Sequence, residues 1–239
     1  MITCTCAVCH SSDQKDKRLR VSILLEMEDK TIVIDSGPDF RYQMLRAQVK
    51  DLDAILYTHE HKDHVAGLDD IRPFNYLLKK NIDIYATERV QQALKREFSY
   101  IFSDVRYPGL PQIDMHTIGT EVFHIGQTEI MPLEIMHYRL PILGFRINEF
   151  TYITDAKTVS EETIAKIRGT KILVVNALQK EAHISHFTLD EAIAFSNRIG
   201  AETTYLTHIS HNLGRHEDVE KDLPPNIKLA YDGLTLYSE

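Results

Sequence analysis

Short apolar stretches typical of β-strands recur along the whole chain, and stretches with the 3.6-residue period of amphipathic helices separate them. The strands that this pattern predicts are 21–27, 31–34, 53–57, 82–86, 113–118, 121–124, 129–137, 143–147, 150–154, 171–175 and 203–207. The predicted helices are a short one with Pro38 in its first turn, 87–98, 160–169 and 188–200. The capping box Thr188-Leu189-Asp190-Glu191 opens the last of them. Strands and helices that interleave in both halves indicate an α/β fold with helices outside its sheets.

No linker-like change of composition divides the 239 residues, so we predict a single domain over residues 1–239. Apolar residues make up 43% and charged residues 26%, which is typical of a globular chain. A membrane helix needs about 20 apolar residues, and no run approaches that length. The first six residues lack the basic and apolar regions of a signal peptide. We therefore expect no membrane partner and a cytoplasmic location.

The net charge limits the class of partner. Lys and Arg number 27 against 35 Asp and Glu, which gives a formal charge of −8. Proteins that bind long nucleic acids usually carry a positive charge or a basic face, and the one basic cluster here, 15–20, is brief. A small anionic substrate is compatible with this balance if metal ions supply the positive charge, whereas long nucleic acid is not favoured.

The three cysteines lie close together near the start, within a cysteine-rich segment over residues 1–12. Cys4, Cys6 and Cys9 have the spacing C-x-C-x-x-C, and an odd number of cysteines argues against a disulfide framework. Thiolates at this spacing can converge on one soft ion such as zinc, with a fourth ligand from elsewhere. The alternative is three unrelated thiols, or a redox pair with one thiol left over.

A second group of candidate ligands follows the predicted strand 53–57. His59, His61, Asp63 and His64 lie within six residues, and side chains two apart in an extended segment point to the same side. Imidazole and carboxylate ligands suit zinc, manganese or iron. The alternative for this group is a solvated polar loop.

Three more candidate ligands stand alone at the ends of predicted strands. His137, Asp155 and His208 each follow an apolar run. A single histidine at a strand end is more often structural than a ligand. Three such residues together with the 59–64 cluster favour one shared metal site at a sheet edge.

The pattern His-x-His-x-Asp-His at 59–64, with His137, Asp155 and His208 at wide spacing, resembles the metallo-β-lactamase superfamily. The resemblance covers nearly the whole chain and implies an αββα sandwich, two mixed sheets flanked by helices, with two metal ions at their upper edges. It assigns one ion to His59, His61 and His137, and the other to Asp63, His64 and His208. Asp155 and a hydroxide would bridge the ions, and Asp35 would orient the ligands from behind.

Two further motifs narrow the resemblance to the PhnP-type enzymes, which hydrolyse phosphoribosyl 1,2-cyclic phosphate. These are the stretch 67–74, Gly-Leu-Asp-Asp-Ile-Arg-Pro-Phe, and the N-terminal cysteines. In this branch the cysteines bind a structural zinc, and its fourth ligand would be His211. His10 is the alternative candidate for the fourth ligand. Such relatives usually begin with a short strand and a glycine-rich turn, so a start three residues before Cys4 predicts a trimmed start or a missing edge strand.

His186 resembles the His-x-Thr element of PhnP-type enzymes and tRNase Z, in which this histidine donates a proton or contacts phosphate. The rival is a surface histidine, which is also our interpretation of His183.

The resemblance therefore implies a metal-dependent phosphodiesterase for a small, cyclic phosphate ester. Its catalytic residues would be Asp63 and His186, and its cofactors two manganese or zinc ions, with iron as a further alternative, besides one structural zinc. The alternatives are a tRNase Z-like nuclease, a thioester or lactone hydrolase of the same fold, and a non-catalytic metal-binding protein. A homodimer is left open.

Overall fold

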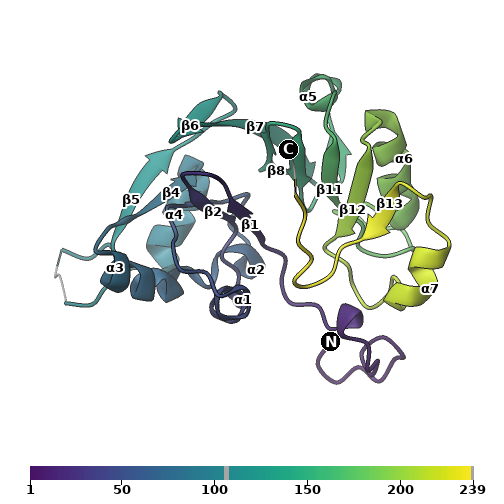
Figure 1. Ribbon diagram of the computed structural model, residues 1–239, viewed down its shortest axis with the longest axis horizontal. Helices are drawn as coiled ribbons and strands as arrows, with labels where there is room; N and C mark the ends of the chain where they lie inside the picture. The colour runs from purple at the N-terminus through teal and green to yellow at the C-terminus, as the bar shows by residue number, and fades with distance from the viewer. Residues whose placement is uncertain (105–107, 238–239) are drawn as a thin grey trace. The chain divides into compact units, whose positions relative to one another are not determined.

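Two mixed β-sheets, each with its own helices, make up most of the computed structural model, which describes residues 1–104 and 108–237 (Figure 1). The chain forms two compact units. Unit 2 is Arg20–Thr128, and unit 1 combines Met1–Leu19 with the chain from Glu129 onward. The expected mixed α/β fold with two helix-flanked sheets is confirmed, while the single-domain organisation stays a prediction.

Unit 2 is built on a five-stranded sheet of order β1-β2-β3-β4-β5, in which only the β1–β2 pair is antiparallel. Alternate strand residues such as Val33, Ile55 and Ile84 pack with the helices into one apolar core. The elements of unit 2 are β1 (Ile23–Glu26), β2 (Thr31–Ile34), α1 (Phe40–Ala47), β3 (Ala54–Leu56), α2 (Lys62–Val65), the 3₁₀ helix η2 (Leu68–Ile71), α3 (Arg72–Leu78), β4 (Ile82–Ala86), α4 (Glu88–Glu97), β5 (Ile113–Thr117) and β6 (Phe123–Ile125).

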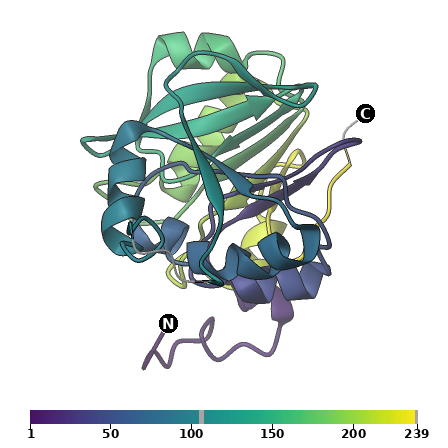
Figure 2. The ribbon, with the colours of Figure 1, turned by 90° about the vertical axis from the view of Figure 1, so that its left-hand side faces the viewer.

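Unit 1 has a sheet of order β10-β7-β8-β9-β11-β12-β13, and several of its strands run side by side in green in Figure 2. Its core joins these strands to three helices through residues such as Ile164, Phe195 and Val219. The elements of unit 1 are the 3₁₀ helix η1 (Gln14–Asp16), β7 (Thr128–His137), β8 (Leu140–Ile147), β9 (Phe150–Ile153), β10 (Thr158–Val159), α5 (Glu161–Ile167), β11 (Ile172–Asn176), α6 (Leu189–Ile199), β12 (Thr203–Thr207), α7 (His216–Lys221) and β13 (Ile227–Leu229).

Most predicted elements are present within a few residues, and their local signals act as expected. The Thr188 hydroxyl accepts from the Glu191 N–H, the Glu191 carboxylate accepts from the Thr188 N–H, and Gly200 ends α6 at φ 72°. The pattern missed the helices α2, α3 and α7 and the strands β10 and β13. Helix α3 leaves Tyr76 83% and Leu77 73% exposed, so its apolar residues do not form one stripe. The short strands exist only because distant strands pair with them.

The N-terminal segment is attached to unit 1 by polar contacts, and it lies beside α7 in Figure 1. Asp16 accepts the backbone N–H of His216 at 2.7 Å, and the Arg18 guanidinium donates to the carbonyl of Ala230 and to Nδ1 of His216. Asp232 accepts the N–H of Leu19 at 3.1 Å. These contacts hold the cysteine-bearing segment next to the chain that follows β12.

In the described part of the chain, five strands are followed by a residue other than glycine with a left-handed backbone, and three of these residues belong to the candidate site; the other two are Tyr138 and Asn148. Asp35 follows β2 with φ 63°, Asp155 follows β9 with φ 56°, and His208 follows β12 with φ 52°. This conformation costs a non-glycine residue about 1 kcal/mol, and such strain gathers at functional sites. It turns the chain sharply where each strand ends. Asp155 and His208 are candidate metal ligands, and Asp35 is the candidate for orienting the ligands.

We predict that this strain is measurable at His208. In the presence of chelator, the free energy of unfolding of His208→Gly, measured by urea denaturation, should be about 1 kcal/mol higher than that of His208→Ala. The reason is that glycine adopts φ > 0 freely. Thr207, one residue earlier in extended β12, is the matched control. There glycine should be the less stable choice, by about 0.5–1 kcal/mol. If both positions favour alanine, His208 carries no strain.

Candidate active site

Unit 2 gathers its four candidate ligands directly after β3 and at the start of α2. His59 and His64 are fully buried, and their ring centroids lie 4.1 Å apart. The ring of His61 packs edge-on against His59, with centroids at 4.6 Å. Oδ2 of Asp63 lies 3.9 Å from Nε2 of His64. The segment therefore presents three imidazoles and a carboxylate within one small region.

A buried carboxylate orients two of these imidazoles. Asp35 accepts from Nδ1 of His64 at 2.7 Å and from the backbone N–H and hydroxyl of Thr58 at 2.9 and 2.8 Å. Because the Thr58 hydroxyl donates to Asp35, its oxygen accepts from Nδ1 of His59, 3.0 Å away. Both histidines thus carry their proton on Nδ1, which leaves the Nε2 lone pairs for a metal ion. Asp35 thus contacts the candidate ligand segment, where the resemblance places an orienting carboxylate.

Two glycines allow the Asp35 turn to lie against the ligand segment. The backbone N–H of Gly67 donates to the carbonyl of Ser36 at 2.8 Å. A Cβ at Gly37 would come within 2.2 Å of the carbonyl oxygen of Asp63, and one at Gly67 within 2.2 Å of that of Gly37. Any larger residue at either position would push the ligands away from the carboxylate that orients them.

Unit 1 arranges its candidate residues around Asp155, which is only 2% exposed. Nε2 of His208 lies 3.2 Å from Oδ1 of Asp155, and Nε2 of His186 lies 3.3 Å from Oδ2. The hydroxyl of Thr154 donates to Oδ1 at 2.6 Å. One ligand atom from each of Asp155, His186 and His208 falls within 4.8 Å of the others. A buried carboxylate between two imidazoles is a donor set that suits a divalent ion.

Backbone carbonyls orient His137 in the same unit. Its Nδ1 lies 2.8 Å from the carbonyl oxygen of Asp155 and 2.9 Å from that of Ser185. A nitrogen that faces two acceptors must carry the proton, so Nε2 of His137 keeps its lone pair. His137, like His59 and His64, is held in the form that binds a metal ion.

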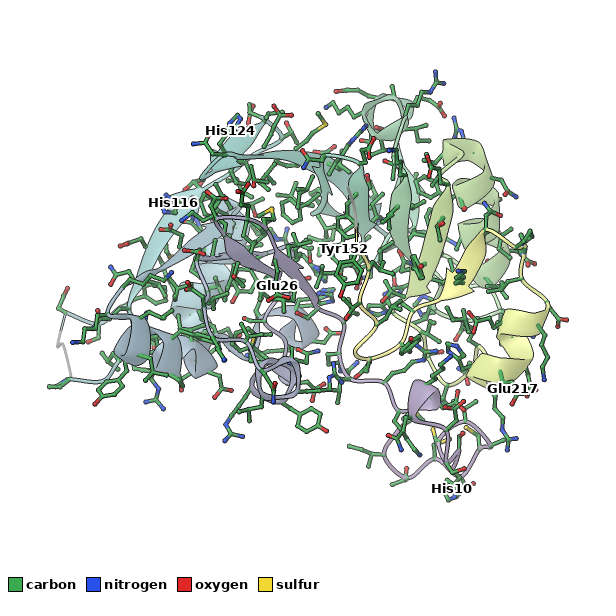
Figure 3. The ribbon with its side chains drawn as sticks, viewed as in Figure 1. His10, Glu26, His116, His124, Tyr152 and Glu217 are labelled. Atoms are coloured by element: carbon green, nitrogen blue, oxygen red, sulfur yellow. The ribbon has the colours of Figure 1, made fainter. Side chains whose placement is uncertain are left out.

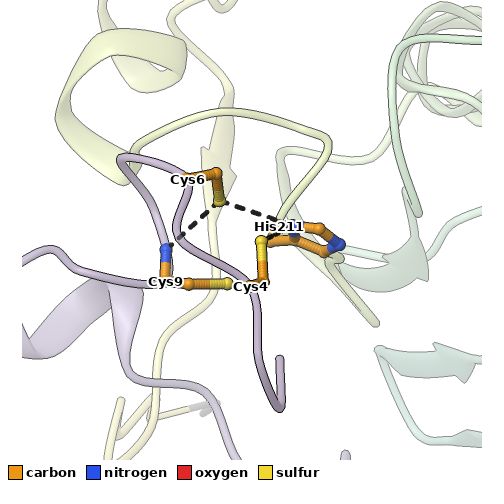
Figure 4. Close-up of side chains that lie close together, drawn as sticks. All are labelled: Cys4, Cys6, Cys9 and His211. Atoms are coloured by element: carbon orange, nitrogen blue, oxygen red, sulfur yellow. Dashed lines mark hydrogen bonds between the residues drawn. The ribbon is translucent and has the colours of Figure 1, made fainter.

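The cysteines and His211 meet within unit 1 (Figure 4). One ligand atom from each of Cys4, Cys6, Cys9 and His211 lies within 4.8 Å of the others, and Nδ1 of His211 lies 3.5 and 3.4 Å from the sulfurs of Cys4 and Cys6. The backbone N–H of Cys9 and then His211 lower the pKa of Cys6 to about 6. Three thiols and one imidazole are the ligands of a structural zinc site.

The structure does not place His10 with this group. His10 is exposed and lies at the outer end of the N-terminal segment, as its label in Figure 3 shows. The structure brings His211 to the cysteines across 207 positions, as the resemblance implies, whereas the spacing of the cysteines alone gives no sign of it.

Reasoning from the sequence missed three residues that shape the site: Thr58, Ser185 and His183. His183 was expected at the surface, but it is half-buried and its Nδ1 lies 3.1 Å from Nδ1 of His186. The only signal in the sequence was the three-residue interval between the two histidines. Thr58 precedes His59 directly, and a hydroxyl next to a candidate ligand is a usable indication of a supporting role.

Among the described residues, none of the helices combines the length and the apolar character needed to cross a lipid bilayer.

Comparison with known proteins identifies the family of this chain. The model of the Beta-lactamase superfamily domain matches residues 30–209. A crystal structure of a diphosphatase from the PhnP family is 38% identical, with a TM-score of 0.93, and the match covers 100% of this chain and 92% of that one.

Two curated proteins also match. The octanoyltransferase of Porphyromonas gingivalis is 39% identical over 236 residues, 98% of this chain but 48% of its own length. Ribonuclease Z of a Nostoc species is 25% identical over 133 residues, 54% of this chain and 40% of its own length. The chain thus spans about half or less of these curated relatives.

The superfamily model covers most of the chain, and the similarity to the PhnP-family structure extends over nearly all of both proteins. The chain therefore belongs to the beta-lactamase superfamily and, within it, to the PhnP-type metallohydrolases.

Proposed function

We propose that the candidate ligands of the two units serve one centre with two divalent ions. His59, His61 and His137 would bind one ion, Asp63, His64 and His208 the other, and Asp155 both. The support is chemical: His59, His64 and His137 each have Nδ1 engaged by an acceptor, so each offers Nε2. Nitrogen and oxygen donors suit manganese or zinc, with iron as an alternative.

We propose that this centre hydrolyses a small phosphodiester, and that the ester is cyclic. The observation that carries the proposal is the set of oriented histidines and aspartates in a chain 38% identical to a PhnP-family diphosphatase. Divalent ions at such a site lower the pKa of a bound water and neutralise phosphoryl charge. A small ester is favoured over long RNA or DNA by the net charge of −8, despite the similarity to ribonuclease Z.

The residues of the chain have distinct roles in this proposal. Asp35 and Thr58 fix the imidazoles, so that no reorganisation is needed when substrate binds. Asp63, besides serving as a ligand, would steer the attacking water. His186, next to Asp155, would protonate the leaving alkoxide.

The cysteine site is proposed to hold one zinc that supports the fold. Cys4, Cys6, Cys9 and His211 would be its ligands. Reduced thiolates of this kind are typical of cytosolic proteins, so we keep the cytoplasm as the proposed location.

A second candidate is hydrolysis of an acyl ester or thioester. It is favoured by the similarity to an octanoyltransferase, in which this chain matches only half of the protein. A protein that binds metal without turnover is the third alternative, and activity alone separates it from the other two.

We predict that the manganese- or zinc-loaded protein hydrolyses phosphodiesters, cyclic ones fastest, in a panel that also contains linear diesters, RNA, lactones and an octanoyl thioester. Asp155→Asn should lose nearly all of this turnover and at least one ion, because asparagine lacks the negative charge shared by two cations. Asp190→Asn, at an exposed position of α6, is the control. Turnover of the thioester alone would favour the second candidate. A folded Asp155→Asn protein with two main-site ions and normal rates would refute the shared-ligand assignment.

The metal count should separate the two kinds of site. We expect three ions per chain by elemental analysis, and the triple variant of Cys4, Cys6 and Cys9 to Ser should lose one zinc and keep two ions. His211→Ala should also lose this zinc, whereas His10→Ala should keep it. Loss of all metal from the cysteine variant would mean that the sites depend on each other.

His186→Ala should slow hydrolysis according to the leaving group. A general acid contributes roughly 10²–10⁴-fold when an alkoxide leaves, and little when a nitrophenolate leaves. We therefore expect the large loss only with alkyl esters, measured as kcat for both series. Equal losses with both would assign His186 to phosphate binding.

A further inference from the structure

The loop before α6 carries a histidine for which the proposed function has no role. His183 and His186 lie three residues apart with ring centroids at 4.9 Å, and their Nδ1 atoms are 3.1 Å apart. The hydroxyl oxygen of Ser185 lies 3.0 Å from Nδ1 of His186 and 3.4 Å from Nδ1 of His183. Two ring nitrogens at this separation must share a proton, because two lone pairs would repel each other.

The position of that proton follows from the backbone. The N–H of Ser185 points at Nδ1 of His183 from 3.3 Å, so this nitrogen is an acceptor and carries no proton. Burial, and then the charges of His186 and Lys157, lower the pKa of His183, which favours its neutral form. The shared proton therefore belongs to Nδ1 of His186, and the single lone pair of the His183 nitrogen accepts both this proton at 3.1 Å and the Ser185 N–H at 3.3 Å. The hydroxyl of Ser185 can rotate to accept or donate, so it cannot fix the proton by itself.

We propose that His183 is a positioning residue, whose Nδ1 holds a proton on Nδ1 of His186 and so directs Nε2 of His186 toward Asp155. Nε2 of His186 lies 3.3 Å from Oδ2 of Asp155. A ring held at Nδ1 cannot flip, so the second proton of the His186 imidazolium is always on Nε2, the nitrogen that meets the leaving group. Delivery of that proton leaves the neutral ring with its proton on Nδ1. The inference rests on the proposed function only in that His186 delivers a proton there.

The same loop also touches the metal ligands, and the test has to separate the two effects. The carbonyl of Ser185 accepts from Nδ1 of His137, while the N–H of Ser185 serves His183. A general disturbance of the loop would therefore affect metal binding as well as His186. Ile184 lies between these residues and is 65% exposed, which makes Ile184→Ala the matched control.

The first measurement is independent of turnover. In the zinc-loaded, full-length protein labelled with ¹⁵N-histidine, NMR reports which ring nitrogen of His186 is protonated, with His186→Ala used to identify the signal. We expect protonated Nδ1 in the wild type and in Ile184→Ala, and a mixture of tautomers in His183→Ala. His183→Phe keeps a ring but removes the acceptor, and should behave as His183→Ala does. His183→Asn offers an amide oxygen in place of Nδ1 and should restore the wild-type signal.

The second measurement uses phosphodiesters with alkyl and nitrophenyl leaving groups. His183→Ala should lose roughly tenfold in kcat with alkyl esters, part of the 10²–10⁴ of a general acid, and less than about twofold with nitrophenyl esters. His183→Asn should recover most of the alkyl rate, and all variants should keep the metal content of the wild type.

An unchanged Nδ1 signal in both His183→Ala and His183→Phe would overturn the proposal. Equal slowing with both leaving groups, or loss of an ion, would assign His183 to support of the metal ligands instead and would also overturn it. A His186→Ala protein without any leaving-group effect would refute proton donation by His186. The NMR result would still decide whether His183 holds its proton.

Discussion

The buried carboxylate of Asp35 is the interaction on which the ligand segment of unit 2 depends. An ionised carboxylate inside a protein is costly unless hydrogen bonds satisfy it, and Asp35 accepts from His64 and twice from Thr58. These bonds place the protons of His59 and His64 on Nδ1 and leave Nε2 for metal. Gly37 and Gly67 permit the close approach of backbone segments that brings the carboxylate to the candidate ligands. The orientation of the imidazoles therefore depends on this backbone packing.

In unit 1, other acceptors hold the Nδ1 protons of the histidines. His137 donates its Nδ1 proton to two backbone carbonyls, one of them from Asp155. Nδ1 of His186 faces Nδ1 of His183 at 3.1 Å. Backbone acceptors move only with the strands that carry them, whereas a side-chain acceptor can be replaced by mutation without loss of the fold. The proposed proton donor is therefore the part of the site whose orientation a substitution could change most easily.

The cysteine site and the polar contacts of Arg18 and Asp16 act on one stretch of chain. His211 lies three residues after His208, and His216 begins α7. The N-terminal segment thus holds both ends of the loop that leaves β12, where His208 has a strained backbone. Strain of this kind persists only where neighbouring contacts over-determine the conformation.

The sequence by itself determined the features that depend on neighbours along the chain. Alternation placed His59, His137, Asp155 and His208 at strand ends, and the pair Thr188 and Glu191 announced α6, because periodicity and capping are local. The resemblance, which rests on spacing, supplied the fold and the expectation that Asp35 lies beside the 59–64 histidines and His211 beside the cysteines. Only the tertiary structure decided which histidine nitrogen is protonated, that His183 faces His186, and that β13 pairs with β12. Those outcomes depend on hydrogen-bonding groups that folding brings together from distant parts of the chain, so they cannot be predicted from the spacing of residues in the sequence.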